Sequence, residues 1–235
     1  MKALNDLRFD QPMAVEIHKL AARLWKQVDD QELKTVLITS AVRGEGKSTT
    51  VSYLATAAAL NSDRKILVMD MDFRRPQVNK YLGLEIQRGL ADALQGECPL
   101  DATIIPSELP NLDVIFPAKN AADPNLLINS PRLQIFFKTL RERYDLIILD
   151  TPAIIPVPDA ACLLPVCDGV ILVVMAGVTS KLHLSQARQI CLGMGANFLG
   201  VVVGNVQEAA PSYLDPRYYS GYASLNSPGE ENGSE

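Results

Sequence analysis

Five short segments of the chain are almost continuously apolar: residues 35–39, 65–69, 145–149, 169–174 and 199–203. A sixth segment, 112–116, has the same character. Strands that are covered on both faces carry continuous rather than alternating apolar residues, which is typical of a parallel sheet between two layers of helices. The pattern therefore predicts six buried strands in a mostly parallel sheet.

Stretches with helical periodicity lie between these strands, over residues 48–60, 131–143 and 181–194. A further helix is predicted over residues 12–29, where apolar residues three and four positions apart share one face: Met13, Ile17, Leu20, Ala21, Leu24 and Val28. This alternation of strands and helices predicts a doubly wound α/β fold. Ligands of such folds bind at the carboxyl ends of the strands, so the residues that directly follow the strands are the first candidates for a site.

The composition is that of a globular protein, with 48% apolar and 21% charged residues. A net charge of −5 argues against general nucleic-acid binding. The beginning of the chain lacks the apolar core of a signal peptide, and no apolar run approaches the roughly 20 residues of a membrane span. The four cysteines form no CxxC pair and lie far from both histidines, so we expect free, buried thiols in a reducing, cytoplasmic compartment.

A glycine-rich loop, AVRGEGKS at residues 41–48, joins the first predicted strand to a helix. Its glycines allow successive backbone N–H groups to point at phosphate oxygens, and the helix N-terminus adds partial positive charge. Lys47 can reach the β- and γ-phosphates, and the Ser48 hydroxyl can ligate Mg²⁺. Ala41 replaces the first glycine of the general pattern, but the strand–loop–helix context is intact. We predict a P-loop that binds Mg-ATP through Arg43, Gly44, Glu45, Gly46, Lys47, Ser48 and Thr49.

Acidic residues follow two of the predicted strands. Asp70 and Asp72 come after the second strand, and Asp150 comes after the fourth. A carboxylate near a γ-phosphate can hold a metal-bound water or accept a proton from an incoming hydroxyl. A helix cap or a turn is the alternative for Asp70 and Asp72, and the P-loop upstream favours the catalytic interpretation. Arg74 is predicted to face phosphate, whereas for Arg75 a solvated surface charge is an equal alternative.

The segment from residue 207 to the end has few aliphatic residues, several Pro, Gly and Ser residues, and four of the seven tyrosines of the chain: Tyr213, Tyr218, Tyr219 and Tyr222. This composition predicts a flexible tail. We therefore divide the chain into an N-terminal helix (1–29), a P-loop domain (30–206) and a tyrosine-rich tail (207–235).

From about residue 16 to residue 206 these motifs resemble those of the bacterial tyrosine kinases, the ATPase-derived kinases of polysaccharide export and chain-length control. The most specific match is three apolar residues followed by DxDxR, here at 70–74. GEGKST at 44–49, GLADALQG at 89–96 and DTP at 150–152 support it. The resemblance implies the MinD/ParA-like P-loop ATPase fold of partition and septum-site ATPases. It also implies phosphorylation of tail tyrosines between neighbouring protomers, which predicts Tyr213, Tyr218, Tyr219 and Tyr222 as the sites.

The resemblance assigns roles to the candidate residues. Asp70 would accept the proton of the tyrosine hydroxyl, Asp72 would support the metal or the substrate, and Asn205 would lie near the adenine. The catalytic residues implied in this way are Lys47, Asp70, Asp72, Arg74 and Asp150, and the implied ligands of Mg²⁺ are Ser48, Asp70 and Asp150.

The resemblance also implies partners. The kinase would need a separate membrane protein of the export machinery. This partner would present a cytoplasmic activating segment and hold the kinase at the inner face of the membrane. Other copies of the chain and proteins of polysaccharide synthesis would be its substrates. The family's ring-forming motif on the N-terminal helix is only partial, because Glu16 and Lys19 fit but Ala22 replaces the last basic residue.

Two alternatives remain at this point. A partition- or septum-type ATPase would use ATP hydrolysis as a switch, but Val42 stands where such ATPases place a lysine that reaches across their dimer. A regulator that binds nucleotide without catalysis would fit the departures from the family pattern at Arg43, Tyr53 and Ala153, where Pro, Asn and Pro are common.

Overall fold

The structure, a computed structural model, describes residues 2–7, 12–118 and 123–206. Within them a seven-stranded sheet has the order β3-β4-β2-β5-β1-β6-β7. All neighbouring strands are parallel except β3, which pairs antiparallel with β4. The strands are β1 (Thr35–Ser40), β2 (Ile66–Asp70), β3 (Ile104–Pro106), β4 (Leu112–Ile115), β5 (Leu146–Asp150), β6 (Gly169–Met175) and β7 (Phe198–Gly204). The predicted parallel α/β sheet is confirmed, with every predicted strand within one residue of its observed ends, and β3 is an addition to the prediction.

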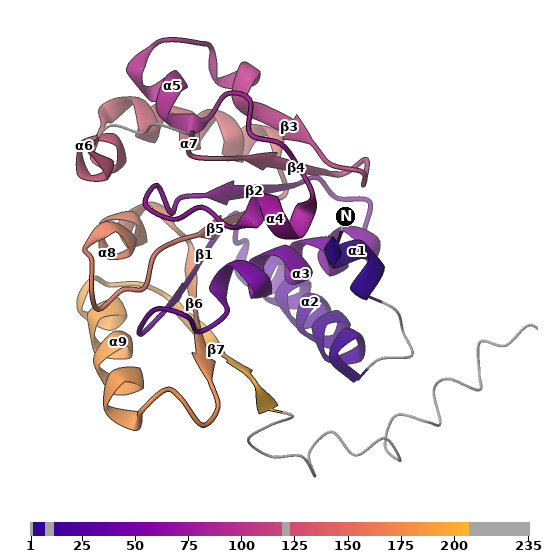
Figure 1. Ribbon diagram of the computed structural model, residues 1–235, viewed down its shortest axis with the longest axis vertical. Helices are drawn as coiled ribbons and strands as arrows, with labels where there is room; N and C mark the ends of the chain where they lie inside the picture. The colour runs from indigo at the N-terminus through magenta and orange to yellow at the C-terminus, as the bar shows by residue number, and fades with distance from the viewer. Residues whose placement is uncertain (1, 8–11, 119–122, 207–235) are drawn as a thin grey trace, which may run out of the picture.

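Helices cover both faces of the sheet (Figure 1). One face carries α1 (Lys2–Asp6), α2 (Pro12–Gln31), α3 (Lys47–Leu60) and α4 (Val78–Leu82). The other carries α5 (Leu90–Gln95), α6 (Pro124–Ile128), α7 (Pro131–Arg143), α8 (Asp159–Leu163) and α9 (Lys181–Gly193), with the 3₁₀ turns Leu100–Thr103 and Leu164–Val166. The four long helices were predicted from periodicity, and the short helices were not.

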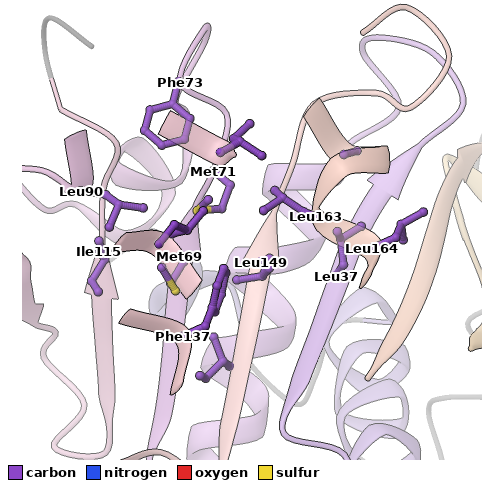
Figure 2. Close-up of a cluster of buried hydrophobic side chains, with 14 of the residues drawn as sticks. Leu37, Met69, Met71, Phe73, Leu90, Ile115, Phe137, Leu149, Leu163 and Leu164 are labelled. Carbon is purple, nitrogen blue, oxygen red and sulfur yellow. The ribbon is translucent and has the colours of Figure 1, made fainter. Parts of the chain in front are cut away.

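Each face of the sheet has its own hydrophobic cluster. Val36 and Ile38 of β1 belong to the cluster under α2 and α3, whereas Leu37 belongs to the cluster under α7, α8 and α9. Figure 2 shows this second cluster, in which Met69 and Leu149 of adjacent strands lie beside Phe137 of α7. Because both faces are buried, apolar residues continue without alternation along the strands, as the sequence pattern indicated.

Helix α2 packs along α3 and completes the first cluster. Trp25 donates its indole N–H to the carbonyl of Ala58, at 3.1 Å. Leu24 and Val28 are buried as predicted, but Met13 has 42% of its surface exposed, and its neighbour Ala14 supplies the first turn's contact with the cluster. An oligomerisation role for this helix stays a prediction.

Three further expectations concern the whole chain. The cysteines are free, as predicted, but only Cys191 is buried, and Cys98, Cys162 and Cys167 are half-buried. None of the helices in the described part of the chain is long and apolar enough to cross a membrane. The predicted tail 207–235, with its four candidate phosphorylation sites, lies outside the described residues.

Candidate active site

The loop between β1 and α3 has the backbone of a phosphate-binding loop. Gly44 and Gly46 both have a φ of 83°, in the left-handed region that favours glycine. A Cβ at either position would meet no atom within 4 Å, so the conformation rather than crowding requires glycine. Gly46 caps α3 without a side-chain hydrogen bond to the first turn, which begins at Lys47. The N–H groups of that turn are therefore available to an anion.

A cleft of about 650 Å³ opens in front of this loop. From the sequence-predicted set, Arg43, Lys47, Ser48, Asp72 and Arg74 line it, together with Gly44, Gly46 and Thr49. These residues come from the loops that follow β1 and β2, and the loop that follows β5 supplies a further wall. The carboxyl ends of three neighbouring strands thus build one site, as the doubly wound fold predicts.

Asp150, the last residue of β5, is a buried carboxylate with unused hydrogen-bonding capacity. It is fully buried, and neither oxygen has a hydrogen-bond partner among the residues that the structure describes. Its pKa is raised to about 7, chiefly by burial and to a smaller extent by Asp72, against the lowering effect of the nearby Ser48 hydroxyl and Lys47 ammonium. A buried acid without partners requires an explanation, and a cation held between Asp150 and Ser48 would supply one.

The donor set fits Mg²⁺ of the P-loop type. The described residues contain no group of three or more His, Cys, Asp or Glu side chains that could enclose a metal by themselves. Mg²⁺ commonly binds through one or two protein oxygens and completes its coordination with water and nucleotide phosphates. Ser48 and Asp150 offer those two oxygens beside the phosphate loop.

Asp70 lies beside Asp150 on the neighbouring strand. The two residues are register partners on β2 and β5, and Asp70 is fully buried. Its Oδ1 accepts a hydrogen bond from the N–H of Asp72 at 3.0 Å, and its Oδ2 accepts from Gln77 and Val78 at 3.2 and 3.3 Å. Burial, and then the charge of Asp150, raise its pKa well above the usual range, although the backbone N–H groups oppose the shift. Asp70 therefore shapes the loop after β2, and, like Asp150, it is not among the residues that line the cleft.

Asp72 is the acid that lines the cleft. One of its oxygens, Oδ1, accepts from the N–H groups of Arg74 and Arg75, at 3.2 and 2.9 Å. Arg74 in turn makes a two-point ion pair with Asp159 at the start of α8. Sequence reasoning placed Asp72 and Arg74 in the site, whereas Asp159 figured only in the match of Asp159-Ala160 to the kinase family and was given no role.

Glu45 fastens the phosphate loop to the loop after β6. Its side chain is buried, with Oε2 accepting from the N–H of Val42 at 2.8 Å and Oε1 accepting from the Thr179 hydroxyl. Thr179 also accepts from the N–H of Met175 at 2.9 Å. Only the backbone of Glu45 is thus left for phosphate. No sequence pattern indicated Thr179, which lies 134 residues away.

Asn205 lies near the cleft, and Tyr81 lines it. Asn205, predicted near the adenine, follows β7 and donates to the carbonyl of Ala176 at 3.4 Å, next to the cleft-lining Met175. On α4, Tyr81 lines the cleft and meets the ring of Tyr53 edge-on, with centroids 6.4 Å apart. Tyr53, where the family commonly has Asn, donates its hydroxyl hydrogen to Asp6 of α1.

Comparisons with known proteins agree with this geometry. A family model described as "AAA domain" matches residues 33–187. The tyrosine-protein kinase CpsD of Streptococcus agalactiae is 31% identical over 211 residues, which cover 89% of this chain and 92% of CpsD. The kinase domain of the Escherichia coli tyrosine kinase ETK superposes with a TM-score of 0.75 at 28% identity, covering 81% of this chain and 74% of ETK's.

The septum site-determining protein MinD of Pyrococcus horikoshii, solved with Mg-ADP, superposes with a TM-score of 0.63 at 22% identity, over 77% of this chain and 75% of MinD. This likeness shows a shared fold. The kinases are more similar, and their names agree with the tyrosine-kinase hypothesis rather than with the two alternatives. The chain therefore belongs to the bacterial tyrosine-protein kinases, which are built on the nucleotide-binding P-loop ATPase fold.

Proposed function

We propose that this protein uses Mg-ATP to phosphorylate tyrosines in the C-terminal segment of other copies of the same chain, and that it thereby regulates the synthesis and export of a polysaccharide. The observation that carries the proposal is the buried Asp150, whose oxygens have no partner in the described part of the chain and which lies beside Ser48 and Lys47. Mg²⁺ and a triphosphate would provide the charge and the hydrogen bonds that this arrangement lacks.

Binding would rest on the phosphate loop. The N–H groups at residues 44–49 and the Lys47 ammonium would hold the phosphates, while Ser48 and Asp150 would hold Mg²⁺. The metal would supply neutralisation of the charge that develops on the terminal phosphates. The remaining catalysis would come from positioning and from fixed positive charge, because phosphoryl transfer needs little other chemistry from a protein.

In the reaction, the tyrosine oxygen forms a bond to the γ-phosphorus, the bond to the bridging oxygen breaks, and ADP leaves. The tyrosine proton must go to a base, since a phenol with a pKa of about 10 is protonated at neutral pH. Asp70 was predicted as this base, but both of its oxygens accept hydrogen bonds from backbone N–H groups. We assign the role to Asp72, which lines the cleft and keeps Oδ2 outside the bonds that hold its loop.

The acceptors would be Tyr213, Tyr218, Tyr219 and Tyr222, approached from a neighbouring copy of the chain. The resemblance to the family further supports a membrane-bound co-polymerase that activates the kinase and recruits it to the membrane, and proteins of polysaccharide synthesis as other substrates. These partners are part of the same proposal.

The test is a phosphosite map. The purified protein is incubated with Mg-ATP, with and without the cytoplasmic segment of the co-polymerase, and phosphotyrosine is located by mass spectrometry. We expect phosphate on the tail tyrosines and its loss in Lys47→Met. The matched control is Lys65→Met, which removes an exposed lysine at the opposite end of the sheet and should leave phosphorylation unchanged.

Two results would contradict the proposal. One is a tail without phosphotyrosine under both conditions. The other is equal phosphorylation of the parent protein and Lys47→Met, since this would mean that the phosphate comes from a contaminating kinase.

A further inference from the structure

A two-point ion pair joins two loops of the cleft that are far apart in the sequence. Arg74 donates from Nε to one oxygen of Asp159 at 3.0 Å and from Nη2 to the other at 3.2 Å. The Asp159 side chain is completely buried, while that of Arg74 is 39% exposed. An acid in such a position depends on its partner, because a buried carboxylate without a counter-charge is strongly unfavourable.

The pair connects two walls of the cleft. Arg74 belongs to the loop after β2, from which Asp72 and Gln77 also line the cleft. Asp159 ends the loop after β5, from which Pro152 and Pro156 line it. The near end of the β5 loop is fastened to β1 by backbone hydrogen bonds, such as that from Ile154 to the Ser40 carbonyl at 2.8 Å. The ion pair is the corresponding attachment at the far end of this loop.

The pair also fixes the direction of the guanidinium group. Asp159 engages Nε and Nη2, so the Nη1 edge stays outside the pair while Arg74 itself lines the cleft. A planar fork held along one edge presents its remaining donors in a fixed direction. A group that is already oriented needs no rearrangement when charge develops on a transferring phosphoryl group.

We propose that Asp159 is a positioning residue for phosphoryl transfer. It holds Arg74 at the mouth of the cleft, in reach of the terminal phosphate, and it fixes the spacing between the β2 and β5 loops. The inference rests on the proposed kinase function, because the group that Arg74 meets is the phosphoryl group in transfer. Asp159 acts through Arg74 and touches neither nucleotide nor acceptor.

The first test is Asp159→Asn, which keeps the shape of the side chain and removes its charge. We expect kcat for tail phosphorylation to fall about 10- to 100-fold, with KM for ATP changed less than about 3-fold, because orientation in the transition state is lost. Affinity for ADP, measured by calorimetry, should stay within about 2-fold, since ADP lacks the phosphate that Arg74 meets. An Asp159→Asn protein with unchanged kcat would overturn the proposal.

The second variant, Arg74→Lys, keeps the positive charge but loses the fork, and it guards against misfolding of Asp159→Asn. We expect a similar loss of kcat with a melting temperature close to that of the parent protein. The kcat of the double variant should lie within about 2-fold of the kcat of the slower single variant, because the two residues act as one unit. Losses that multiply would mean that the residues act independently, and this would also overturn the proposal.

A measurement without turnover separates this inference from the proposed function. Hydrogen exchange of the ligand-free protein should show faster exchange at Ile154 and Ile155 in both single variants, because their loop has lost its far attachment. If the parent protein forms no phosphotyrosine, the proposed function fails, while the exchange data still test the attachment. Unchanged exchange in both variants would overturn the attachment between the walls.

The matched control is Asp101→Asn. Asp101 also pairs with an arginine, Arg143, but both side chains are exposed and neither lines the cleft. Exposed pairs contribute little, so kcat, ADP affinity and loop exchange should all match the parent protein. A loss of kcat in this variant equal to that in Asp159→Asn would mean that any broken ion pair slows the enzyme.

Discussion

Two aspartates at opposite ends of the sheet have opposite surroundings. Asp168 precedes β6 at the amino end, and its Oδ2 accepts from the N–H groups of Lys34 and Thr35 at 2.7 and 2.8 Å. Its two oxygens also accept from both Nη atoms of Arg141, at 2.8 and 3.0 Å. Asp150 ends β5 at the carboxyl end and has no such partner within the described residues, although it is more deeply buried than Asp168.

The difference separates groups that hold the fold together from groups that await a ligand. A satisfied acid such as Asp168 ties a strand, the start of β1 and α7 into one network, so its bonds stabilise the protein. An unsatisfied buried acid destabilises the empty protein and is tolerated where it serves binding or catalysis. Replacing each acid by asparagine should therefore have opposite effects: Asp150→Asn should lower activity and raise stability, whereas Asp168→Asn should lower stability and leave activity unchanged.

The largest effect should come from Asp150→Asn on catalysis. Loss of the charge that we propose to hold Mg²⁺ should lower kcat for tail phosphorylation by about 10²- to 10³-fold, as removal of a central electrostatic group commonly does. Steady-state phosphorylation at saturating Mg-ATP measures this. Asp168→Asn is the comparison, and its folded fraction should retain the kcat of the parent protein. Equal losses of kcat in the two variants would contradict the distinction between a catalytic Asp150 and a structural Asp168.

The next effect concerns the stability of the ligand-free protein against pH. The folded pKa of Asp150 is about 7, against 3.8 ordinarily, so between these values the folded protein keeps a proton that the unfolded chain releases. Asp150 therefore destabilises the fold increasingly from about pH 4 to pH 7, and by a constant amount above pH 7. Asp150→Asn should be more stable than the parent by on the order of 4 kcal/mol at pH 8, and by less than half of this at pH 5.

Urea denaturation of both proteins at the two pH values measures this difference, without nucleotide and metal. A variant that is less stable than its parent at pH 8 would show that Asp150 already has adequate partners in the empty protein. With Mg-ATP present, the parent protein should become the more stable of the two, because only the parent gains the full stabilisation from binding.

A smaller effect of opposite sign is expected for Asp168→Asn. The amide can no longer accept four hydrogen bonds or balance the charge of Arg141, so unfolding should require about 2 kcal/mol less at pH 7. Chemical denaturation is again the measurement. If the free energy of unfolding falls by less than about 0.5 kcal/mol, the Asp168 network contributes no more than an exposed ion pair does.

The smallest effect should follow from Tyr53→Phe. Tyr53 lies on α3, the helix that follows the phosphate loop, but its hydroxyl donates to Asp6. Like Asp168, it should therefore contribute to stability and not to catalysis. Loss of one hydrogen bond predicts about 1 kcal/mol less stability and an unchanged kcat. A large change in kcat with unchanged stability would instead assign Tyr53 to the catalytic apparatus, through its contact with Tyr81.

The sequence was sufficient for the long elements and for the phosphate loop. Continuous apolar runs identify strands such as β5 and β6 because burial on both faces removes the alternation. The loop at 41–48 combines glycines, Lys47 and a helix start in adjacent residues, so its geometry is local and can be predicted. Short helices such as α4 and α8 have five residues each, too few for a helical period to emerge.

The site depended more on contacts between distant residues. Arg74 and Asp159 are 85 residues apart, and no local pattern pairs one arginine with one of many acids. Asp70 and Asp72 are indistinguishable as sequence symbols, yet one side chain is enclosed by backbone N–H groups and the other lines the cleft. Strand order also lies beyond a local pattern, although it is what places Asp150 beside the phosphate loop.

Helix α3 is enclosed on all sides, because every residue from Val51 to Ala59 is buried between the sheet and its neighbouring helices. The phosphate end of such a helix cannot tilt or fray independently of the whole protein. An arriving nucleotide therefore loses little affinity to the conformational entropy of this segment.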